Sequence, residues 1–464
     1  MEDIREKPMF SGKQLLMLIL PLIIEQALAI AVGMVDTAMV SGCGEAAISA
    51  VSLVDSINTL LIQLFSAMSA GGSIIAAQYI GHQDRRNACA AAKQLFIAIF
   101  LIAFAVGAAA LIFSRPLLSL IFGSIEQEIM DQAQTYFLIS ALSYPFLALY
   151  NSGAGVLRAM GNTKSTMYIS FLMNVINVVG NYFLIHPTHG VSLGGASVTV
   201  WGAGLGVGGA AWASLAARAF AALIVIKMLL NQRLPIHISE PLQLKPDLKM
   251  TRRIMHIGLP NGLENSLFQV GKLIIAGLIA TFSTSVIAAN SICNSISGLV
   301  NIPGNGIALA TVTVIGQCMG ARELDQAKRY AKKLTLWMVL SLLPMNVVLF
   351  FFPGVFVGLY QLSSEAAALS CTLLRQYAVF DVLMWMTSFG LPSVLRAAGD
   401  VRFTMTVSML SMLICRLAFS YLFALVFGMG LTGVWMAMYC DWLVRSAFFV
   451  WRFFSGKWQR HRII

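Results

Sequence analysis

The chain alternates between long apolar runs and short polar segments. Twelve of the runs have about 20 residues or more, the length that an α-helix needs to cross the hydrocarbon core of a bilayer. We therefore expect an all-α, polytopic membrane protein with twelve transmembrane helices. The predicted spans are residues 14–41, 46–80, 94–113, 133–157, 165–186, 207–230, 254–281, 286–318, 334–352, 370–395, 403–427 and 431–454.

Two of the spans, 46–80 and 286–318, are longer than one straight crossing requires. The first contains Gly-Gly-Ser at 71–73, and the second contains Pro-Gly-Asn-Gly at 303–306. Sharp helix kinks usually occur at proline or at pairs of glycine and serine. We expect these two helices to bend or to end early.

Composition supports a membrane protein. Hydrophobic residues make up 58% of the 464 residues and charged residues 11%, with a mean hydropathy of +0.79. Soluble domains have roughly 25% charged residues. The first ten residues contain no apolar signal-peptide core and no small-residue cleavage site, so we expect the first span to direct insertion.

The basic residues predict the orientation. Of the 31 Lys and Arg, 26 lie in the N-terminal tail, in the C-terminal segment from residue 445 onward, and in or next to the loops after the even-numbered spans. The positive-inside rule then places both termini in the cytoplasm of a multi-pass protein of the inner (plasma) membrane. The net charge of +11 is dispersed over seven short segments. It therefore predicts contact with anionic lipid headgroups of the bilayer, not with nucleic acid.

The two halves of the chain are related in sequence. Residues 20–95, shifted by 239 positions, align without a gap and give 16 identities in 76 positions. The identities include three polar or glycine pairs: Glu25 with Glu264, Gln78 with Gln317, and Gly81 with Gly320. Apolar composition inflates chance matches, but it does not explain these three.

Two later pairings extend the repeat. LRAMGNTKSTM at 157–167 matches LRAAGDVRFTM at 395–405, and GVGGAAWA at 206–213 matches GLTGVWMA at 430–437. Each half then holds six helices and starts on the same side, so we predict parallel repeats related by a pseudo-two-fold axis along the membrane normal. The expected lobes are residues 1–235 and 236–464, an architecture that suits a transporter with its substrate site between the lobes.

Ionisable residues inside the spans are the candidate site residues. A charge at membrane depth is costly, so its presence there suggests a function. A desolvated carboxylate can exchange a proton in the physiological range, and a group of carboxylates concentrates cations. The sequence places these residues inside the spans: Glu25, Asp36, Asp55, Arg218, Glu264, Lys272, Asp381 and Arg416.

Structural roles compete with transport roles for several of these residues. Glu25 and Glu264 each follow a proline by four residues, where a helix-start or snorkelling carboxylate is common. Lys272 can neutralise one of the acids. Asp55 aligns with Asn294, so a polar contact between helices is as good an interpretation as a transport role. Asp36 aligns with Ile275. The repeated scaffold does not require its charge, which favours a functional role.

Helix 165–186 carries a stripe of amides. Asn174, Asn177 and Asn181 are spaced i, i+3 and i+7, which places them on one face. They can line a cavity or join helices by hydrogen bonds. The pattern alone leaves both interpretations open.

The sequence lacks the motifs of several functional classes. The seven cysteines are scattered without a C-x-x-C pair, so we expect them to be packing residues, and we expect no metal site or cofactor. No G-x4-GK[ST] nucleotide loop is present, which excludes a self-contained ATP-driven pump. No nucleophile and base lie at one depth in the predicted spans, so we do not expect an enzyme.

Five motifs together carry a family resemblance: P-x14-D-T-x-M-V-S-G at 21–42, Q-x2-G at 78–81 and 317–320, LRAxG in both halves, the basic Arg416, and G-x2-G-x-W at 430–435. Because the motifs occur in this order, the chain resembles the multidrug and toxic compound extrusion (MATE) family, from about residue 12 to 455. The resemblance implies two six-helix bundles around a V-shaped cleft. It also implies export of cationic or amphipathic drugs in exchange for Na⁺ or H⁺.

Asp36 falls on the acid of the family's first helix, which the resemblance implicates in coupling. Two other positions depart from the family. Asn181 stands where one branch has a carboxylate, and the acids of another branch come about one helical turn after Glu264 and Asp381. The coupling ion therefore stays open between Na⁺ and H⁺.

The leading hypothesis is a secondary-active antiporter, acting as a monomer, that exports small cationic or amphipathic molecules. The alternative is a flippase for a lipid-linked precursor. A pyrophosphate-bearing lipid requires several basic residues in the cavity, and the spans offer Arg218, Lys272 and Arg416 among several acids. The residues expected to bind the coupling ion or the substrate are Asp36, Glu25, Asp55, Glu264, Lys272, Asp381, Asn177 and Asn181.

Overall fold

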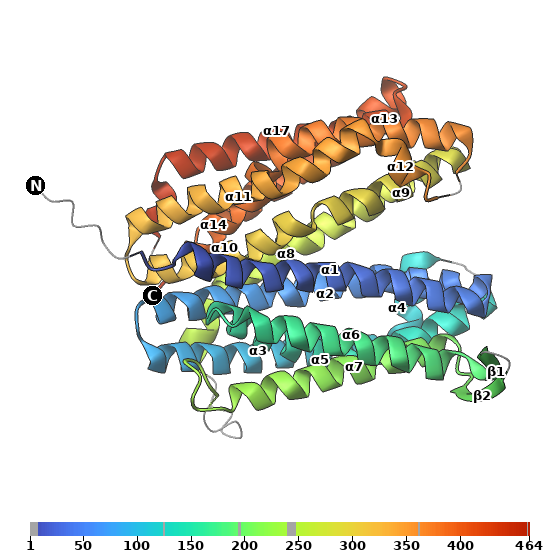
Figure 1. The fold of residues 1–464 in the computed structure, drawn as a ribbon, viewed down its shortest axis with the longest axis horizontal. Helices are drawn as coiled ribbons and strands as arrows, with labels where there is room; N and C mark the ends of the chain where they lie inside the picture. Colours follow the sequence, from blue (N-terminus) through green and yellow to red (C-terminus); the bar gives the residue numbers. More distant parts are fainter. Residues whose placement is uncertain (1–7, 124–125, 194–195, 239–246, 361, 462) are drawn as a thin grey trace, which may run out of the picture. The chain divides into compact units, whose positions relative to one another are not determined.

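The computed structural model describes residues 8–123, 126–193, 196–238, 247–360, 362–461 and 463–464. Each of the first six predicted spans forms a helix (Figure 1). These are α1 (Gly12–Val40), α2 (Glu45–Gly81), α3 (Arg85–Ile112), α5 (Gln127–Ala159), α6 (Thr163–Ile185) and α7 (Val207–Leu229).

The other six spans are helical too, with interruptions. They correspond to α8 (Leu248–Ile279), α9 (Thr284–Val300) with α10 (Ile302–Gly320), α11 (Leu324–Phe351), α13 (Ser364–Phe380) with α14 (Leu391–Ala397), α15 (Val401–Ser411) with α16 (Phe419–Tyr421), and α17 (Gly430–Phe454). Of the described helices, nine are long and apolar enough to cross a membrane. Several helices begin before the apolar run does, α11 at Leu324 and not at residue 334. A helix continues into its polar first turns, whereas hydropathy detects only the part suited to lipid.

The two long spans behave differently. The helical span 286–318 is interrupted at Asn301, and Pro303 lies in the first turn of α10. Proline has no N–H to continue an α-helix but is favoured at a helix start. In contrast, α2 runs unbroken through Gly71 and Gly72, so the expectation that it ends early is wrong. A Cβ on Gly71 would lie 2.5 Å from the backbone of Gly258 in α8, which shows that this glycine allows close packing of two helices.

Two spans of the second half contain π-helical segments. One is η2 (Asp381–Gly390), between α13 and α14. The others are η3 (Met412–Ala418) and η4 (Leu422–Val426), which flank α16. A π-helical turn re-aims the side chains that follow it and is frequent at functional sites. Hydropathy does not distinguish it from an α-helix, so the sequence did not predict it.

Short elements lie between the spans. α4 (Ser114–Phe122) and α12 (Pro353–Val357) begin 239 positions apart, so they are equivalent elements of the two repeats. The Gly/Ser/Thr-rich segment after α6 forms an antiparallel hairpin of β1 (Pro187–Leu193) and β2 (Ala196–Ala203). Residues 239–246, in the segment that joins the two predicted lobes, lie outside the described residues.

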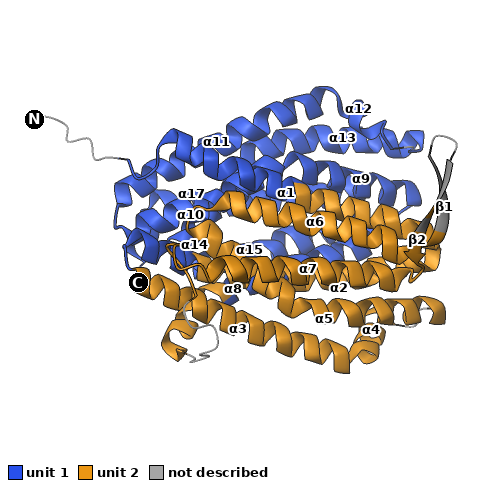
Figure 2. Cartoon of the chain, turned by 60° about the horizontal axis from the view of Figure 1, so that its bottom comes forward, with its two compact units in different colours: residues 1–27, 74–84, 259–464 blue, residues 28–73, 85–258 orange. Residues whose placement is uncertain are grey.

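The chain divides into two compact units, shown in Figure 2. Unit 1 contains residues 1–27, 74–84 and 259–464, and unit 2 contains residues 28–73 and 85–258. Both units are discontinuous because α1, α2 and α8 each contribute to both. The lobe boundary expected near residue 235 refers to the sequence repeats and not to these units, and it stays a prediction.

Each unit has its own tight helix packing. In unit 1, the ring of Tyr377 packs edge-on against Trp435 and Trp442, with 5.9 Å between centroids in both pairs. In unit 2, α5 packs against α7 at Gly153, where a Cβ would lie 1.7 Å from Val225. Aromatic pairs and small residues at crossings are the usual way to bring membrane helices together when no hydrophobic force acts between them.

A reciprocal contact inside unit 1 joins equivalent positions of the two repeats. A Cβ on Gly81 would lie 1.9 Å from the carbonyl oxygen of Gln317, and a Cβ on Gly320 would lie 1.8 Å from the carbonyl oxygen of Gln78. Gln78 pairs with Gln317 in the repeat alignment, and Gly81 pairs with Gly320. When residue i contacts j and the mate of j contacts the mate of i, the contact has two-fold symmetry. This is the relation expected of parallel repeats.

Candidate functional site

Unit 2 brings polar side chains from five helices together around Asp36. α1 supplies Asp36 and α2 supplies Asp55, while α6 and α7 supply amides, a hydroxyl and a guanidinium. Two tyrosines of α5 complete the group. We call these residues the Asp36 cluster: Asp36, Asp55, Asn58, Tyr136, Tyr144, Asn177, Asn181, Ser214 and Arg218.

A chain of hydrogen bonds starts at the Asp36 carboxylate. The amide nitrogen of Asn181 donates to Asp36 Oδ1 at 2.6 Å and also contacts Asn177 Oδ1 at 3.3 Å. The amide nitrogen of Asn177 then donates to Ser214 Oγ at 3.0 Å. Asn181 is buried, and its own Oδ1 has no partner among the described residues. A carboxylate beside a free amide oxygen is a set of oxygen donors that suits a hard cation.

Asp55 has its own hydrogen-bond partners. Tyr136 donates its hydroxyl hydrogen to Asp55 Oδ1 at 3.2 Å, and Asn58 donates from its amide at 3.2 Å. Tyr144 donates to the oxygen of the same Asn58 amide at 2.8 Å. Asp55 is exposed while Asn58 and both tyrosines are buried. The buried donors therefore hold the carboxylate at the edge of the cluster.

Arg218 is the basic residue of the cluster. Its Nη1 donates to Ser143 Oγ at 2.6 Å, and it lies close enough to Asp36 and Asp55 to interact electrostatically with both. Among the described residues, neither carboxylate forms an ion pair. Two carboxylates facing one guanidinium leave one negative charge when both are ionised. The cluster can neutralise that charge with a proton or a metal cation.

The amide stripe of α6 is divided between two roles. Asn174 donates to the carbonyl oxygen of Leu28 at 3.0 Å, which joins α6 to α1. Asn177 and Asn181 instead extend the hydrogen-bond chain from Asp36. The structure thus assigns Asn174 to helix packing and places the two predicted site amides at the acid.

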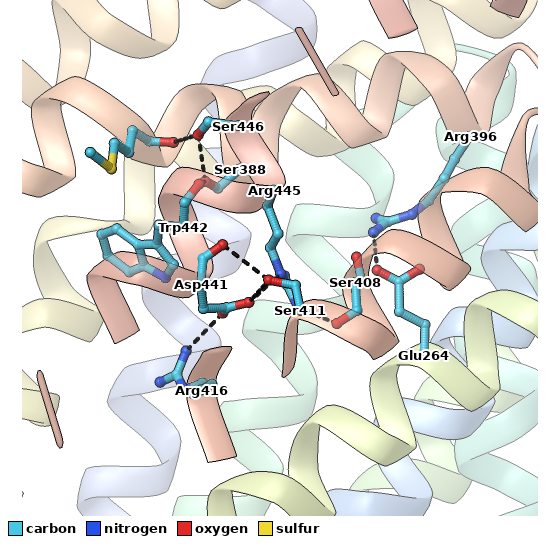
Figure 3. A network of polar contacts seen from close by, with 11 residues as sticks. Glu264, Ser388, Arg396, Ser408, Ser411, Arg416, Asp441, Trp442, Arg445 and Ser446 are labelled. Atoms are coloured by element: carbon cyan, nitrogen blue, oxygen red, sulfur yellow. Dashed lines mark hydrogen bonds and ion pairs between the residues drawn. The ribbon is translucent and has the colours of Figure 1, made fainter. Parts of the chain in front are cut away.

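Glu264 forms an ion pair in unit 1. Arg396 of the LRAxG motif lies 2.8 Å from Glu264 Oε1, as Figure 3 shows. This contact joins α8 to α14, which supports a structural role for Glu264. Its repeat mate Glu25 is buried as well, in the part of α1 that belongs to unit 1.

Asp381 is fully buried where α13 joins the π-helical segment η2. Asn346 of α11 donates to Asp381 Oδ2 at 2.7 Å, and the Tyr377 hydroxyl is also a hydrogen-bond partner. Among the described residues, no ion pair joins Asp381 to Lys272. The partners of Asp381 join α11 to α13.

Lys272 lies in a pocket of unit 1. We call it the Lys272 pocket; its volume is about 270 Å³, and it is lined by Lys272, Ile275, Ala276, Ile279, Asn290, Asn294, Arg416, Val434, Trp435 and Met438. We expected Lys272 to neutralise an acid. In the described part of the chain no carboxylate pairs with it, and its ammonium instead lies 5.3 Å from the centre of the Phe268 ring. The lining of the pocket is basic, amide and apolar.

Asp441 lies next to Arg416, which lines this pocket, and also pairs with Arg445. Arg445 Nε is 3.0 Å from Asp441 Oδ1, and Arg416 Nη1 is 3.8 Å from Asp441 Oδ2. Ser411 also donates to Asp441 (Figure 3). Sequence reasoning missed both residues, although an acid and a base four positions apart inside an apolar span are a readable signal of an ion pair. It also missed Asn58, Tyr136 and Tyr144, whose roles depend on which helices meet.

Histidine and cysteine form no metal centre in the described residues. No group of three His, Cys, Asp or Glu side chains is placed to hold a metal ion. All seven cysteines are free thiols.

The chain is similar to known proteins in family profile, sequence and structure. The MatE family profile matches residues 21–183 and 260–422, two stretches that begin and end 239 positions apart. That spacing confirms the internal repeat. The chain is 26% identical to the "Uncharacterized transporter YisQ" of Bacillus subtilis over 98% of this chain and 96% of that protein. It is 24% identical to the "Probable multidrug resistance protein NorM" of Thermotoga maritima, covering 97% and 94%.

Solved structures share the fold. The "Crystal structure of MATE in the bent conformation" matches with a TM-score of 0.84 at 21% identity, covering 96% of each chain. An "Outward-facing conformation of a multidrug resistance MATE family transporter of the MOP superfamily" matches with a TM-score of 0.83 at 20% identity, also covering 96% of each chain. The twelve-helix fold with two repeats is confirmed.

Proposed function

The chain belongs to the MatE family of multi-pass membrane transporters, and from this premise we propose that it is a secondary-active antiporter of the inner membrane. It exports small organic cations or amphipathic drugs in exchange for Na⁺ or H⁺. The names of relatives as multidrug resistance proteins support the substrate class. The coupling step is assigned from the Asp36 cluster.

The observation that carries the proposal is the environment of the Asp36 carboxylate. The carboxylate lies inside an apolar helix and accepts a hydrogen bond from Asn181, and no described base forms an ion pair with it. Its repeat mate is Ile275, so the shared scaffold is built without this charge. Packing does not require this charge, and a charge is costly at this depth. Binding of a transported cation best explains why the acid is present.

Competition for one carboxylate makes exchange obligatory. Asp36 can accept a proton, or it can face Na⁺ together with the free oxygen of Asn181. An organic cation that needs the same negative charge is excluded while the ion is bound. Binding of the ion and of the substrate are then linked, and each weakens the other by the same factor.

The test is gradient-driven transport in liposomes. Purified protein is reconstituted, a Na⁺ gradient or a H⁺ gradient is imposed separately, and movement of a fluorescent organic cation such as ethidium is followed. We expect one of the two gradients to drive accumulation of the dye, and Asp36→Asn to abolish that accumulation while leaving insertion intact. The variant keeps the shape of the side chain and removes the charge.

A matched control is Asp131→Asn in the same unit. Asp131 is an exposed carboxylate of α5 whose described contact is with its neighbour Gln127, so the same chemical change there should leave transport unaffected. Accumulation by Asp36→Asn at the wild-type rate would contradict the proposal and direct attention to Glu264 and Asp381.

The proposed orientation has a separate test. If both termini are cytoplasmic, a membrane-impermeant thiol reagent should label Gly190→Cys, in the hairpin after α6, from outside the cell. It should label Glu240→Cys, in the segment between α7 and α8, only from inside. A background without the native cysteines is needed because all seven are free. Labelling of both positions from one side would overturn the orientation.

A further inference from the structure

The Lys272 pocket occupies the place in the second repeat that the Asp36 cluster occupies in the first. Ile275 and Asn294 line the pocket, and they are the repeat mates of Asp36 and Asp55. Met438 also lines it and is the mate of Ser214, whose hydroxyl ends the hydrogen-bond chain from Asp36. The equivalent places therefore have acids in one repeat and neutral residues in the other.

The second repeat adds cations at this place. Three basic side chains surround the ring of Phe268: Lys272 at 5.3 Å, Arg416 at 5.2 Å and Arg445 at 5.4 Å from the ring centre. Cations are attracted to the face of an aromatic ring. That attraction helps to hold three like charges near one another, but it does not neutralise them.

Asp441 balances only part of this charge. It pairs with Arg445 at 3.0 Å, while Arg416 is farther away, at 3.8 Å, and Lys272 has no described acidic partner. Three cations and one carboxylate leave two positive charges. Lys272 and Arg416 are the two that line the pocket. An excess of positive charge among apolar helices is costly unless a ligand compensates it.

The remaining walls suit a charged group attached to an apolar body. Asn290 and Asn294 add amides, and the indole nitrogen of Trp435 donates to Asn290 Oδ1 at 3.1 Å. The other lining side chains are aliphatic or contain sulfur, such as Ile279, Val434 and Met438. A volume of about 270 Å³ is slightly below the usual range for a drug-sized ligand. It is adequate for one end of such a ligand.

We propose that the Lys272 pocket binds the carboxylate of an organic anion or zwitterion, with Lys272 and Arg416 as the charge-bearing residues and the Trp435 wall against the apolar body. Lys and Arg donate charge-assisted hydrogen bonds to carboxylates, which are stronger than neutral ones. The substrates of this transporter then include molecules with a carboxylate, in addition to the cations assigned to the Asp36 cluster. Binding at this pocket does not depend on the antiport reaction.

The experiment is equilibrium binding to the full-length protein in nanodiscs of phosphatidylcholine, without any ion gradient. Three probes share one pyrene ring and differ in the end group: the anion 1-pyrenebutyrate, its neutral methyl ester and the cation 1-pyrenebutylamine. Because no gradient is present, a failure of the antiport proposal leaves this result unaffected. We expect the carboxylate to bind at least 10-fold more tightly than the ester.

Variants connect the preference to the pocket. Lys272→Gln and Arg416→Gln should each weaken binding of pyrenebutyrate about 10-fold and leave binding of the ester unchanged. Asn294→Asp is nearly isosteric with the wild type and restores the acid that the first repeat has, so it should reduce the preference for the carboxylate without a change in fold. The control is Arg375→Gln, which removes an exposed cation of α13 in the same unit, and which should bind all three probes as the wild type does.

Three results would overturn the proposal. The first is equal binding of the carboxylate and the ester by the wild type. The second is an unchanged preference in Lys272→Gln, Arg416→Gln and Asn294→Asp. The third is loss of pyrenebutyrate binding when phosphatidylglycerol replaces a fraction of the phosphatidylcholine, because the pocket would then be a site for lipid headgroups.

Discussion

The two repeats differ in the charge of their side chains at equivalent positions. In the first, Asp36 and Asp55 face one guanidinium, and tyrosines and amides hold the two acids. In the second, Ile275 and Asn294 replace the acids, and Lys272 and Arg416 line a pocket. Packing between the halves is symmetric at the contact of Gly81 and Gly320. The helix scaffold is therefore shared by the two repeats, while the charge at equivalent places is opposite. This difference distinguishes residues that build the fold from the residues that we propose bind ligands.

The largest effect is expected at the two acids of the first repeat, and it should be unequal. Asp36→Asn should lower gradient-driven dye export about 100-fold, near the upper end of the coupling usual between two linked sites. Asp55→Asn should lower it no more than about 5-fold, the lower end of the same range, because the second repeat has Asn294 at this place and keeps the fold. The measurement is initial export rate in liposomes at equal protein content. Equal losses in the two variants would remove the distinction between the acids.

A smaller loss is expected when the partner of Asp36 is changed. Asn181→Leu removes a hydrogen bond to a charged group, worth about 2 kcal/mol, and it also removes the free oxygen proposed as an ion ligand. We expect coupled export to fall roughly 30-fold, the ratio of rates that corresponds to about 2 kcal/mol. Asn174→Leu is the control on the same helix, because Asn174 bonds to the backbone of α1. If Asn174→Leu lowers export as much as Asn181→Leu does, the amide stripe acts as one structural unit.

The symmetric scaffold predicts equal effects at equivalent glycines. In Gly81→Ala and Gly320→Ala, the new methyl group would overlap a backbone carbonyl oxygen, at 1.9 Å and 1.8 Å respectively. Overpacking of this kind costs about 2 kcal/mol. Thermal unfolding in one detergent should show similar decreases in Tm for the two variants. A large decrease in only one of them would contradict the two-fold relation at this contact.

The smallest effect is expected at the ion pair of Glu264 with Arg396. Arg396 is 23% exposed, so solvent screens the pair. Glu264→Gln retains a hydrogen-bond acceptor and should destabilise the protein by about 1 kcal/mol. It should leave the ion dependence of transport unchanged, which transport under Na⁺ and H⁺ gradients measures. A change of the coupling ion in this variant would move Glu264 from the scaffold to the transport site.

Much of the fold could be predicted from the sequence, because bilayer length and repeat spacing constrain it strongly. Hydropathy located all twelve helical spans, and Pro303 indicated the break between α9 and α10. The hairpin of β1 and β2 and the π-helical segments were not predicted. A strand pair in a polar loop has no hydropathy signal, and a π-helix has the same composition as an α-helix.

Prediction of the site was less complete, because it depends on which helix faces meet. The sequence named Asp36, Asn177 and Asn181 as candidates, and the structure joins them in one hydrogen-bond chain. It assigned Lys272 to an acid, whereas the ammonium lies over Phe268. Spacing along one helix gives the face on which a residue lies, but the partner comes from another helix.

The most direct test of the account is the affinity of the wild-type protein for the organic cation at a series of Na⁺ concentrations and pH values. If the cation and the coupling ion compete for Asp36, the Kd of the cation rises with one of the two ions. The Kd of that ion then rises by the same factor when the cation is present. In Asp36→Asn this dependence should disappear. A cation affinity that is independent of both Na⁺ and pH in the wild-type protein would contradict the assignment of coupling to Asp36.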